Sequence, residues 1–251
     1  MPLAGCNAFS INIFGWSTIE PREGQFHFDD LDRTFDRIAS FGGKVLLATP
    51  SGARPPWMHK LYPATARVAN DGHRNAYMGR HNHCWTSPDF RRLVHAMNLR
   101  LADRYGTHPA LAMWHISNEL SGECFCNLCR AQFALWLKRK YETVEAMNGA
   151  WWTHYWSHRY NSFDEVEPTD PCVECLQLDW RRFNTWQMCD WIDFEAAPLR
   201  KLTPDVPITT YLMGTFPNAD YNQVAGHIDV ISDDQYPNYD VDSPQFFRAA
   251  G

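Results

Sequence analysis

Short apolar runs alternate with amphipathic segments along the 251-residue chain. Five of the runs are almost continuously apolar, which is typical of strands buried on both faces of a sheet. The segments between them carry apolar residues three and four positions apart, the spacing of a helix with one buried face. The pattern predicts strands at 8–14, 44–49, 110–117, 207–213 and 227–233, and helices at 28–41, 87–106, 129–142 and 178–202.

The alternation of strands and helices predicts a parallel sheet with helices outside it. A (β/α) barrel and an open doubly wound sheet both fit this pattern. No glycine-rich phosphate loop follows any of the five strands, which disfavours a nucleotide-binding sheet. Polar and aromatic residues gather just past the strand ends, on the face where a barrel carries its active site: Trp16, Glu20, Thr49, Asn118, Glu119, Asp234 and Tyr236.

Charge and composition narrow the classes of partner. The formal net charge is −6 and no basic face is evident, so we expect no nucleic-acid partner. The chain shows neither a secretion signal nor an apolar run long enough to span a bilayer, so we expect a cytoplasmic protein without a membrane partner. The eleven tryptophans suit a sugar-binding surface as well as a core.

The dipeptide Asn118-Glu119 ends the third apolar run. A carboxyl group buried beside aromatic residues at this point would have a raised pKa, so it would stay protonated until it donates to a leaving oxygen. The neighbouring amide can hold a substrate hydroxyl. The alternative is structural: Glu119 caps the next helix or pairs with an arginine.

Eight cysteines in a chain without a secretion signal favour metal binding over disulfides. Three of them form a C-x-C-x-x-C motif, and Cys84, at the end of a long loop before a helix, can meet that motif as a fourth ligand. Four thiolates leave no open position on zinc, so such an ion is structural. The alternatives are free thiols, a second site at Cys172 and Cys175, or a histidine ligand. The residues concerned are Cys84, Cys124, Cys126 and Cys129 for the zinc site, and His81, His83 and His154 as substitutes.

Nine segments resemble, in the same order, segments of glycoside hydrolase family 42, the retaining β-galactosidases. They are GWSTIEPREGQFHFDDLDR, LLATPSGARPPWMHKLYP, GRHNHCWTSPDF, WHISNE, CFCNLC, FALWLKRKY, MNGAWWTHYWSHRYNSFDEV, LDWRRF and DDQYP. The likeness covers essentially the whole chain, with departures from the family pattern in GAWWTHYW and DDQYP. It implies a (β/α)8 TIM barrel that cleaves terminal β-D-galactosides by double displacement.

The resemblance also implies roles for individual residues. Glu119 matches the family's general acid/base, and Asn118 matches its partner. Arg80 matches a substrate-binding arginine, Trp156 a tryptophan that stacks on the sugar, and Tyr236 an aromatic residue lining the site. Many family members carry a zinc ion on four cysteines and assemble as homotrimers, so we expect a structural zinc here and a possible homotrimer.

The five predicted strands fall short of the eight of a complete barrel. By resemblance they correspond to about strands 2 to 6, so residues 1–251 are expected to form a partial catalytic barrel domain that lacks the first strand and strands 7 and 8. The nucleophilic glutamate of the family would then lie outside the chain. Glu20, Asp233 and Asp234 lie at strand ends as possible second carboxylates, although a structural role is expected for each. We therefore expect residues 1–251 alone to be inactive.

Two other functions fit the same residues. One is a glycosidase of different specificity, for β-glucosides or α-arabinosides, because strand-end residues do not separate sugars that differ at one hydroxyl. The other is a non-catalytic carbohydrate-binding barrel that keeps the aromatic residues and the zinc. Glu119 beside Asn118 favours an enzyme, since a binding module needs no acid at that point.

Overall fold

The computed structural model describes residues 5–75, 79–213 and 216–234. Five strands form one parallel sheet in the order β1-β2-β3-β4-β5. The order of the strands in space is their order in the chain, as in a barrel, whereas a doubly wound sheet reverses direction at a switch point. Of the two folds that the sequence left open, this order favours the barrel. The strands are Ala8–Ile11 (β1), Lys44–Ala48 (β2), Leu111–His115 (β3), Ile208–Leu212 (β4) and Val230–Asp233 (β5).

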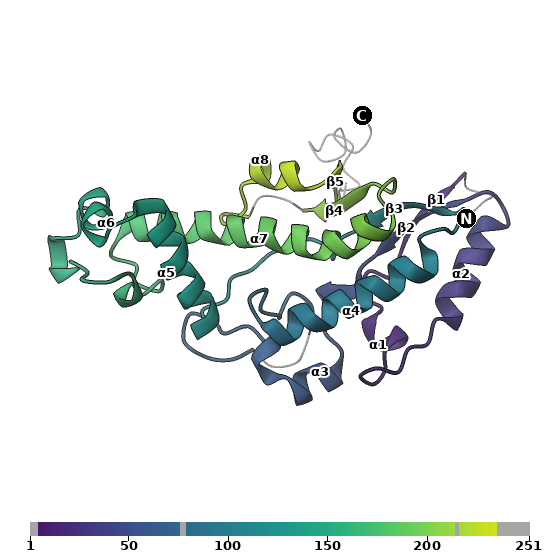
Figure 1. Cartoon of the computed structure of the whole chain (residues 1–251), viewed down its shortest axis with the longest axis horizontal. Helices are drawn as coiled ribbons and strands as arrows, with labels where there is room; N and C mark the ends of the chain where they lie inside the picture. The colour runs from purple at the N-terminus through teal and green to yellow at the C-terminus, as the bar shows by residue number, and fades with distance from the viewer. Residues whose placement is uncertain (1–4, 76–78, 214–215, 235–251) are drawn as a thin grey trace, which may run out of the picture.

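Helices connect the strands and cover one face of the sheet. The long helices α4 and α7 lie side by side against it, and α2 lies beside β1 and β2 (Figure 1). No helix of the described ranges is long and apolar enough to cross a membrane. The α-helices are Trp16–Ile19 (α1), Asp29–Ala39 (α2), Pro56–Leu61 (α3), Pro88–Tyr105 (α4), Asn127–Tyr141 (α5), Val144–Trp151 (α6), Glu174–Leu202 (α7) and Tyr221–Val224 (α8). Short 3-10 turns occur at Pro50–Gly52 (η2), Pro63–Thr65 (η3), Tyr155–Ser157 (η4), Phe163–Glu165 (η5) and Ala225–His227 (η6).

The main hydrophobic core lies between the sheet and the helices α2, α4 and α7. Trp114 on β3 and Trp191 on α7 are fully buried in it. The Trp191 ring stacks on Phe90 of α4, with ring centroids 5.2 Å apart, so aromatic packing joins the two long helices.

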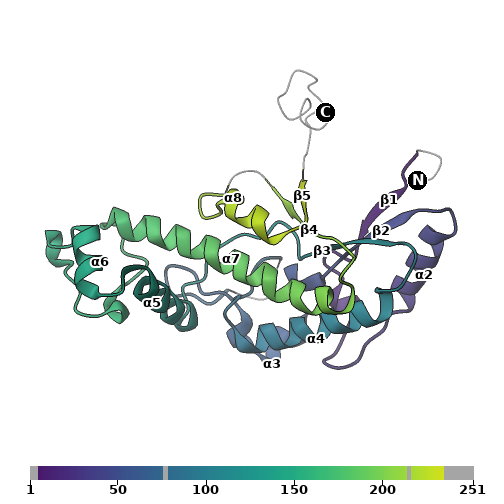
Figure 2. The ribbon, with the colours of Figure 1, turned by 45° about the horizontal axis from the view of Figure 1, so that its top comes forward.

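A second core lies in an arm that extends beyond the sheet. The arm consists of α5, α6 and the first part of α7 (Figure 2). Its buried side chains include Phe133, Trp151, Trp180 and Phe183. Much of the chain's aromatic content therefore serves packing in this arm, rather than a sugar-binding surface.

Two predicted strands end earlier than the apolar pattern suggests. The run expected at 8–14 leaves the sheet after Ile11, because Asn12 has a φ of 68°. The run expected at 110–117 ends at His115, and Ser117 has a φ of 50°. Left-handed residues cannot continue a strand. Both deviations lie at the carboxyl ends of the strands, where the candidate site is located.

Candidate active site and metal centre

Glu119 lies four residues beyond the last residue of β3, on a backbone turned away from the strand direction. Its φ is 44°, a conformation that is unfavourable for a residue other than glycine and is common at functional sites. Its N–H donates to the carbonyl oxygen of Tyr211 on β4, at 3.0 Å. The residue is 2% exposed, and the adjacent Asn118 is 4% exposed, so both predicted site residues lie buried at the same strand end.

Arg80 pairs with this carboxyl group from a different part of the chain. It lies in the long loop between β2 and α4, and its Nη2 is 2.7 Å from Oε2 of Glu119. The guanidinium carbon lies 5.5 Å from the centroid of the Phe14 ring, which follows β1. The Arg80 side chain is 44% exposed, whereas that of Glu119 is 2% exposed. The segments that follow β2 and β3 therefore meet at this carboxyl group, and Phe14, after β1, contacts the arginine on its solvent side.

The surroundings of Glu119 favour its protonated form. Burial raises the pKa of this carboxyl, and the neighbouring Asp234 carboxyl raises it further by hydrogen bonding and like-charge repulsion. Arg80 opposes both effects and lowers the pKa, but the net direction is upward. A carboxyl group whose protonated form is favoured in this way can give its proton to a leaving oxygen.

Glu20, another candidate carboxylate, uses both of its oxygens in hydrogen bonds to nearby residues of the chain. One of its oxygens accepts from Nε1 of Trp16 and the other from the N–H of Gly24, each at 2.7 Å. The residue is 3% exposed. We assign it a structural role, because both of its oxygens are occupied inside the fold.

The four cysteines of the sequence motif come together as one buried cluster. The sulfur atoms of Cys84, Cys124, Cys126 and Cys129 lie within 4.8 Å of one another. Cys84 Sγ is 3.6 Å from Cys126 Sγ and 3.5 Å from Cys129 Sγ, and all four cysteines are free. Four thiolates about 2.3 Å from a tetrahedral zinc lie roughly 3.8 Å apart, close to these separations. The cluster is thus a possible metal site. Among the described residues, neither Cys172 nor Cys175 nor any histidine belongs to this cluster.

A buried arginine lies beside the cysteine cluster. Arg67 is 5% exposed, donates from Nε to the carbonyl oxygen of His83 at 2.8 Å, and lies over the Trp85 ring. A buried guanidinium is strongly unfavourable without a negative partner. The groups that would favour its charge when ionised are the side chains of Cys124, Cys84 and Cys129, together with Glu123. The C-x-C-x-x-C motif predicted the cysteine cluster, but nothing in the motif indicated the buried Arg67 beside it.

In the described structure Trp156 does not lie beside Glu119. Trp156 belongs to η4, which follows α6 in the arm; its side chain is 72% exposed, and its ring contacts that of Tyr155. Within this chain the structure therefore does not bring Trp156 to the acid, and its stacking role stays a prediction. Tyr236 lies outside the described residues, so its role also stays a prediction.

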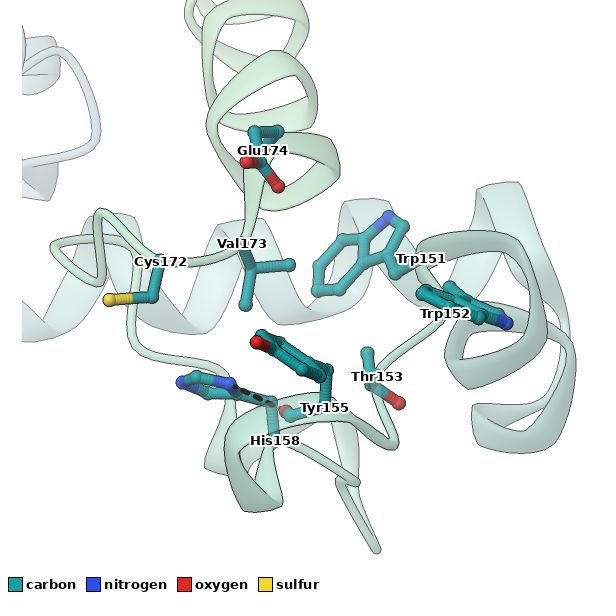
Figure 3. A pocket seen from close by; sticks show the side chains of 8 residues that line it. All are labelled: Trp151, Trp152, Thr153, Tyr155, His158, Cys172, Val173 and Glu174. Atoms are coloured by element: carbon teal, nitrogen blue, oxygen red, sulfur yellow. Dashed lines mark hydrogen bonds between the residues drawn. The ribbon is translucent and has the colours of Figure 1, made fainter.

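The arm carries a hollow of its own, with a volume of about 200 Å³. Trp151, Tyr155 and Val173 face its interior, and Glu174 lies at its edge (Figure 3). Glu174 is the sole carboxylate among the described residues that line it. Because glycoside hydrolysis generally needs a pair of carboxyl groups, the strand ends are the better catalytic candidate.

The chain is similar to known β-galactosidases. The β-galactosidase BglY of Alicyclobacillus acidocaldarius is 47% identical over 237 residues, which cover 93% of this chain and 34% of that protein. The β-galactosidase GanA of Bacillus subtilis is 48% identical over 248 residues, which cover 94% of this chain and 37% of that protein. The chain thus spans about a third of the length of these relatives.

Solved structures agree in fold. The β-galactosidase from Rahnella sp. R3 superposes with a TM-score of 0.93 at 46% identity, covering 96% of this chain and 36% of that one. Gan42B, a family 42 β-galactosidase, superposes with a TM-score of 0.93 at 47% identity, covering 96% of this chain and 37% of that one. The five-stranded sheet is therefore part of a (β/α)8 barrel, as the sequence predicted. The profile of glycoside hydrolase family 42, described as Beta-galactosidase, matches residues 1–249, and the chain belongs to this family.

Proposed function

We propose that this chain supplies the acid/base half of a retaining β-galactosidase active site. Glu119 protonates the leaving oxygen in the first step and removes a proton from the attacking water in the second. The observation that carries the proposal is the buried Glu119 carboxyl, paired with Arg80 at the carboxyl end of β3. A carbohydrate-binding barrel has no use for a carboxyl group whose protonated form is favoured at this point.

A retaining mechanism needs a nucleophilic carboxylate about 5–5.5 Å from the acid. Asp234 is the described carboxylate that lies beside Glu119, where it raises the pKa of Glu119. Because its negative charge disfavours ionisation of Glu119, we assign Asp234 the role of tuning the acid. The nucleophile is proposed to come from a segment outside residues 1–251, within the greater length of the relatives.

A chimera tests both the activity and the specificity. In it, this chain replaces the matching segment of BglY, and the rest of BglY is kept. We expect the chimera to hydrolyse 4-nitrophenyl β-D-galactoside faster than the β-glucoside or the α-arabinoside, and we expect residues 1–251 alone to be inactive. A chimera that melts cooperatively but hydrolyses none of these substrates would favour a binding barrel. Activity of residues 1–251 alone, lost on Asp234→Asn, would instead make Asp234 the nucleophile.

The alkaline limb of the chimera's kcat/KM profile should move in opposite directions when the charge of Arg80 or that of Asp234 is removed. The general acid must be protonated, so kcat/KM falls as the pH rises through the pKa of Glu119. Arg80 lowers this pKa and Asp234 raises it. We expect Arg80→Met to move the alkaline limb to higher pH and Asp234→Asn to move it to lower pH. A shift in the same direction for both variants, measured from about pH 5 to 9, would contradict the assignment of Glu119.

We also propose that the cysteine cluster holds a structural zinc ion. Its support is the set of four converging thiols and the buried Arg67, whose charge a zinc tetrathiolate of net charge −2 would balance. Zinc bound by four thiolates has no open position for water or substrate, so its part is to fix the loops that carry the ligands. One of these loops leads to Arg80 and another begins just after Glu119.

The remaining expectations concern the sugar and the assembly. Trp156 and Tyr236 are proposed to contact the carbohydrate, and the chain is proposed to form a homotrimer. Analytical ultracentrifugation of the chimera tests the trimer. A monomer at all concentrations would exclude it.

A further inference from the structure

The backbone that leads into the acid is held on one side by the neighbouring strand. Residues 116–119 include two left-handed positions, Ser117 with a φ of 50° and Glu119 with a φ of 44°. Residues other than glycine keep such conformations where the surroundings fix them. Ile116 N–H donates to the carbonyl oxygen of Thr209 at 2.7 Å, and Glu119 N–H donates to that of Tyr211 at 3.0 Å. These two bonds tie the ends of the segment to β4.

A buried threonine holds the middle of the segment from the other side. The N–H of Ser117 donates to Oγ1 of Thr49, which follows β2, at 2.7 Å. The Thr49 hydroxyl donates its own hydrogen to Oε2 of Glu195 on α7, also at 2.7 Å. A hydroxyl has one hydrogen, so the carboxylate fixes its direction and leaves a lone pair facing Ser117. Thr49, Ser117 and Glu195 are all 0% exposed.

Glu195 is a carboxyl group on the buried, apolar face of α7. It lies on the buried face of α7 among Trp191, Ala196 and Leu199, where an apolar side chain is expected. Burial raises the pKa of Glu195 to about 7. Its other oxygen accepts from Oγ of Ser51 at 2.6 Å. A buried carboxyl group is unfavourable unless its hydrogen bonds are made, and the catalytic steps above make no use of this one.

We propose that Thr49 and Glu195 are positioning residues for Glu119. Glu195 orients the Thr49 hydroxyl, Thr49 holds the N–H of Ser117, and the carboxyl of Glu119, two residues further on, is thereby aimed at the leaving oxygen. The inference rests on the proposed function of Glu119. A misplacement of about 1 Å in such a group can lower the rate about 100-fold.

Thr49→Val in the chimera breaks this series of hydrogen bonds, and the side chain keeps nearly the same shape. It removes the acceptor for Ser117 N–H and the donor to Glu195. We expect kcat/KM for phenyl β-D-galactoside, whose leaving group needs protonation, to fall about 10- to 100-fold. The value for 2,4-dinitrophenyl β-D-galactoside should change little, because that leaving group departs without an acid. Thr49→Ser keeps the hydroxyl and should restore most of the loss.

Ser51→Ala is the matched control. It removes a hydrogen bond to the same carboxylate, but Ser51 makes no hydrogen bond to Ser117 in the described structure, so activity on both substrates should stay near that of the parent. Glu195→Leu, which removes the acceptor for the Thr49 hydroxyl, is a second variant if Thr49→Val melts too low to assay, and it should show a loss of the same leaving-group dependence. An unchanged Thr49→Val, an equal loss in Ser51→Ala, or an equal loss on both substrates would overturn the proposal. In each case an active parent chimera would leave the proposed function of Glu119 intact.

Discussion

Replacing Glu119 by glutamine in the chimera should lower kcat/KM for phenyl β-D-galactoside about 100- to 10,000-fold, the usual contribution of a general acid. The amide side chain would keep the size of the carboxyl side chain but could not release a proton at neutral pH. The buried Glu119 carboxyl, with its raised pKa, is the group that the structure presents at the strand end, where it pairs with Arg80. Initial rates on a series of phenyl galactosides measure the effect.

The loss should depend on the leaving group. For 2,4-dinitrophenyl β-D-galactoside kcat/KM should change little, while kcat and KM should fall together, because the second step still needs a base. Glu20→Gln is the matched control: it alters another buried glutamate at a strand end whose pKa is also raised by burial. We expect no leaving-group dependence from it. An equal loss for all leaving groups in Glu119→Gln would show a structural role.

Cys126→Ser is the second change with a large expected effect. The serine hydroxyl is a poor zinc ligand, so the zinc content, measured by inductively coupled plasma mass spectrometry, should fall from one ion per chain towards none. Structural zinc contributes about 10–16 kcal/mol to the folding of small zinc domains. Losing about 4 kcal/mol of such a contribution would lower the melting temperature by roughly 8–16 °C.

Cys189→Ser separates loss of the metal from loss of a buried thiol. Cys189 is 5% exposed, comparable to Cys126 at 8%, but it lies outside the cluster. We expect it to keep a full complement of zinc. Zinc content that is equal in Cys126→Ser and in the parent would exclude the proposed site. A melting temperature lowered equally in both variants, with no zinc in either the variants or the parent, would favour simple packing of thiols.

The sheet could be predicted because its strands are local features of the sequence. Apolar runs of about five to eight residues separated by helical spacing identify parallel strands without knowledge of their partners. Their ends were harder to predict, since Asn12 and Ser117 leave the strand through left-handed backbone that the apolar pattern does not reveal. The sequence pattern assigned no element to residues 144–151, which form the helix α6.

The site was predictable where one short segment carries its chemistry. Asn118 and Glu119 are adjacent, and three of the four cysteines lie within six residues, so the sequence alone pointed to both. Glu195 and Arg67 were missed because each acts on residues that are distant in the chain; Glu195 and Thr49 are separated by 146 positions. Glu195 did leave one signal: a carboxylate within the apolar stripe of its helix, which indicates a buried polar group that needs partners.

The central claim is that Glu119 is the acid/base of a retaining enzyme. The measurement is the product that Glu119→Ala forms from 2,4-dinitrophenyl β-D-galactoside in the presence of sodium azide, identified by NMR. Removing the carboxylate removes the base that activates water, and a small anion that needs no base can then attack the galactosyl-enzyme from the vacated side. The account predicts that azide restores turnover and yields β-galactosyl azide. Turnover that azide leaves unchanged, or an α-galactosyl azide product, would contradict it.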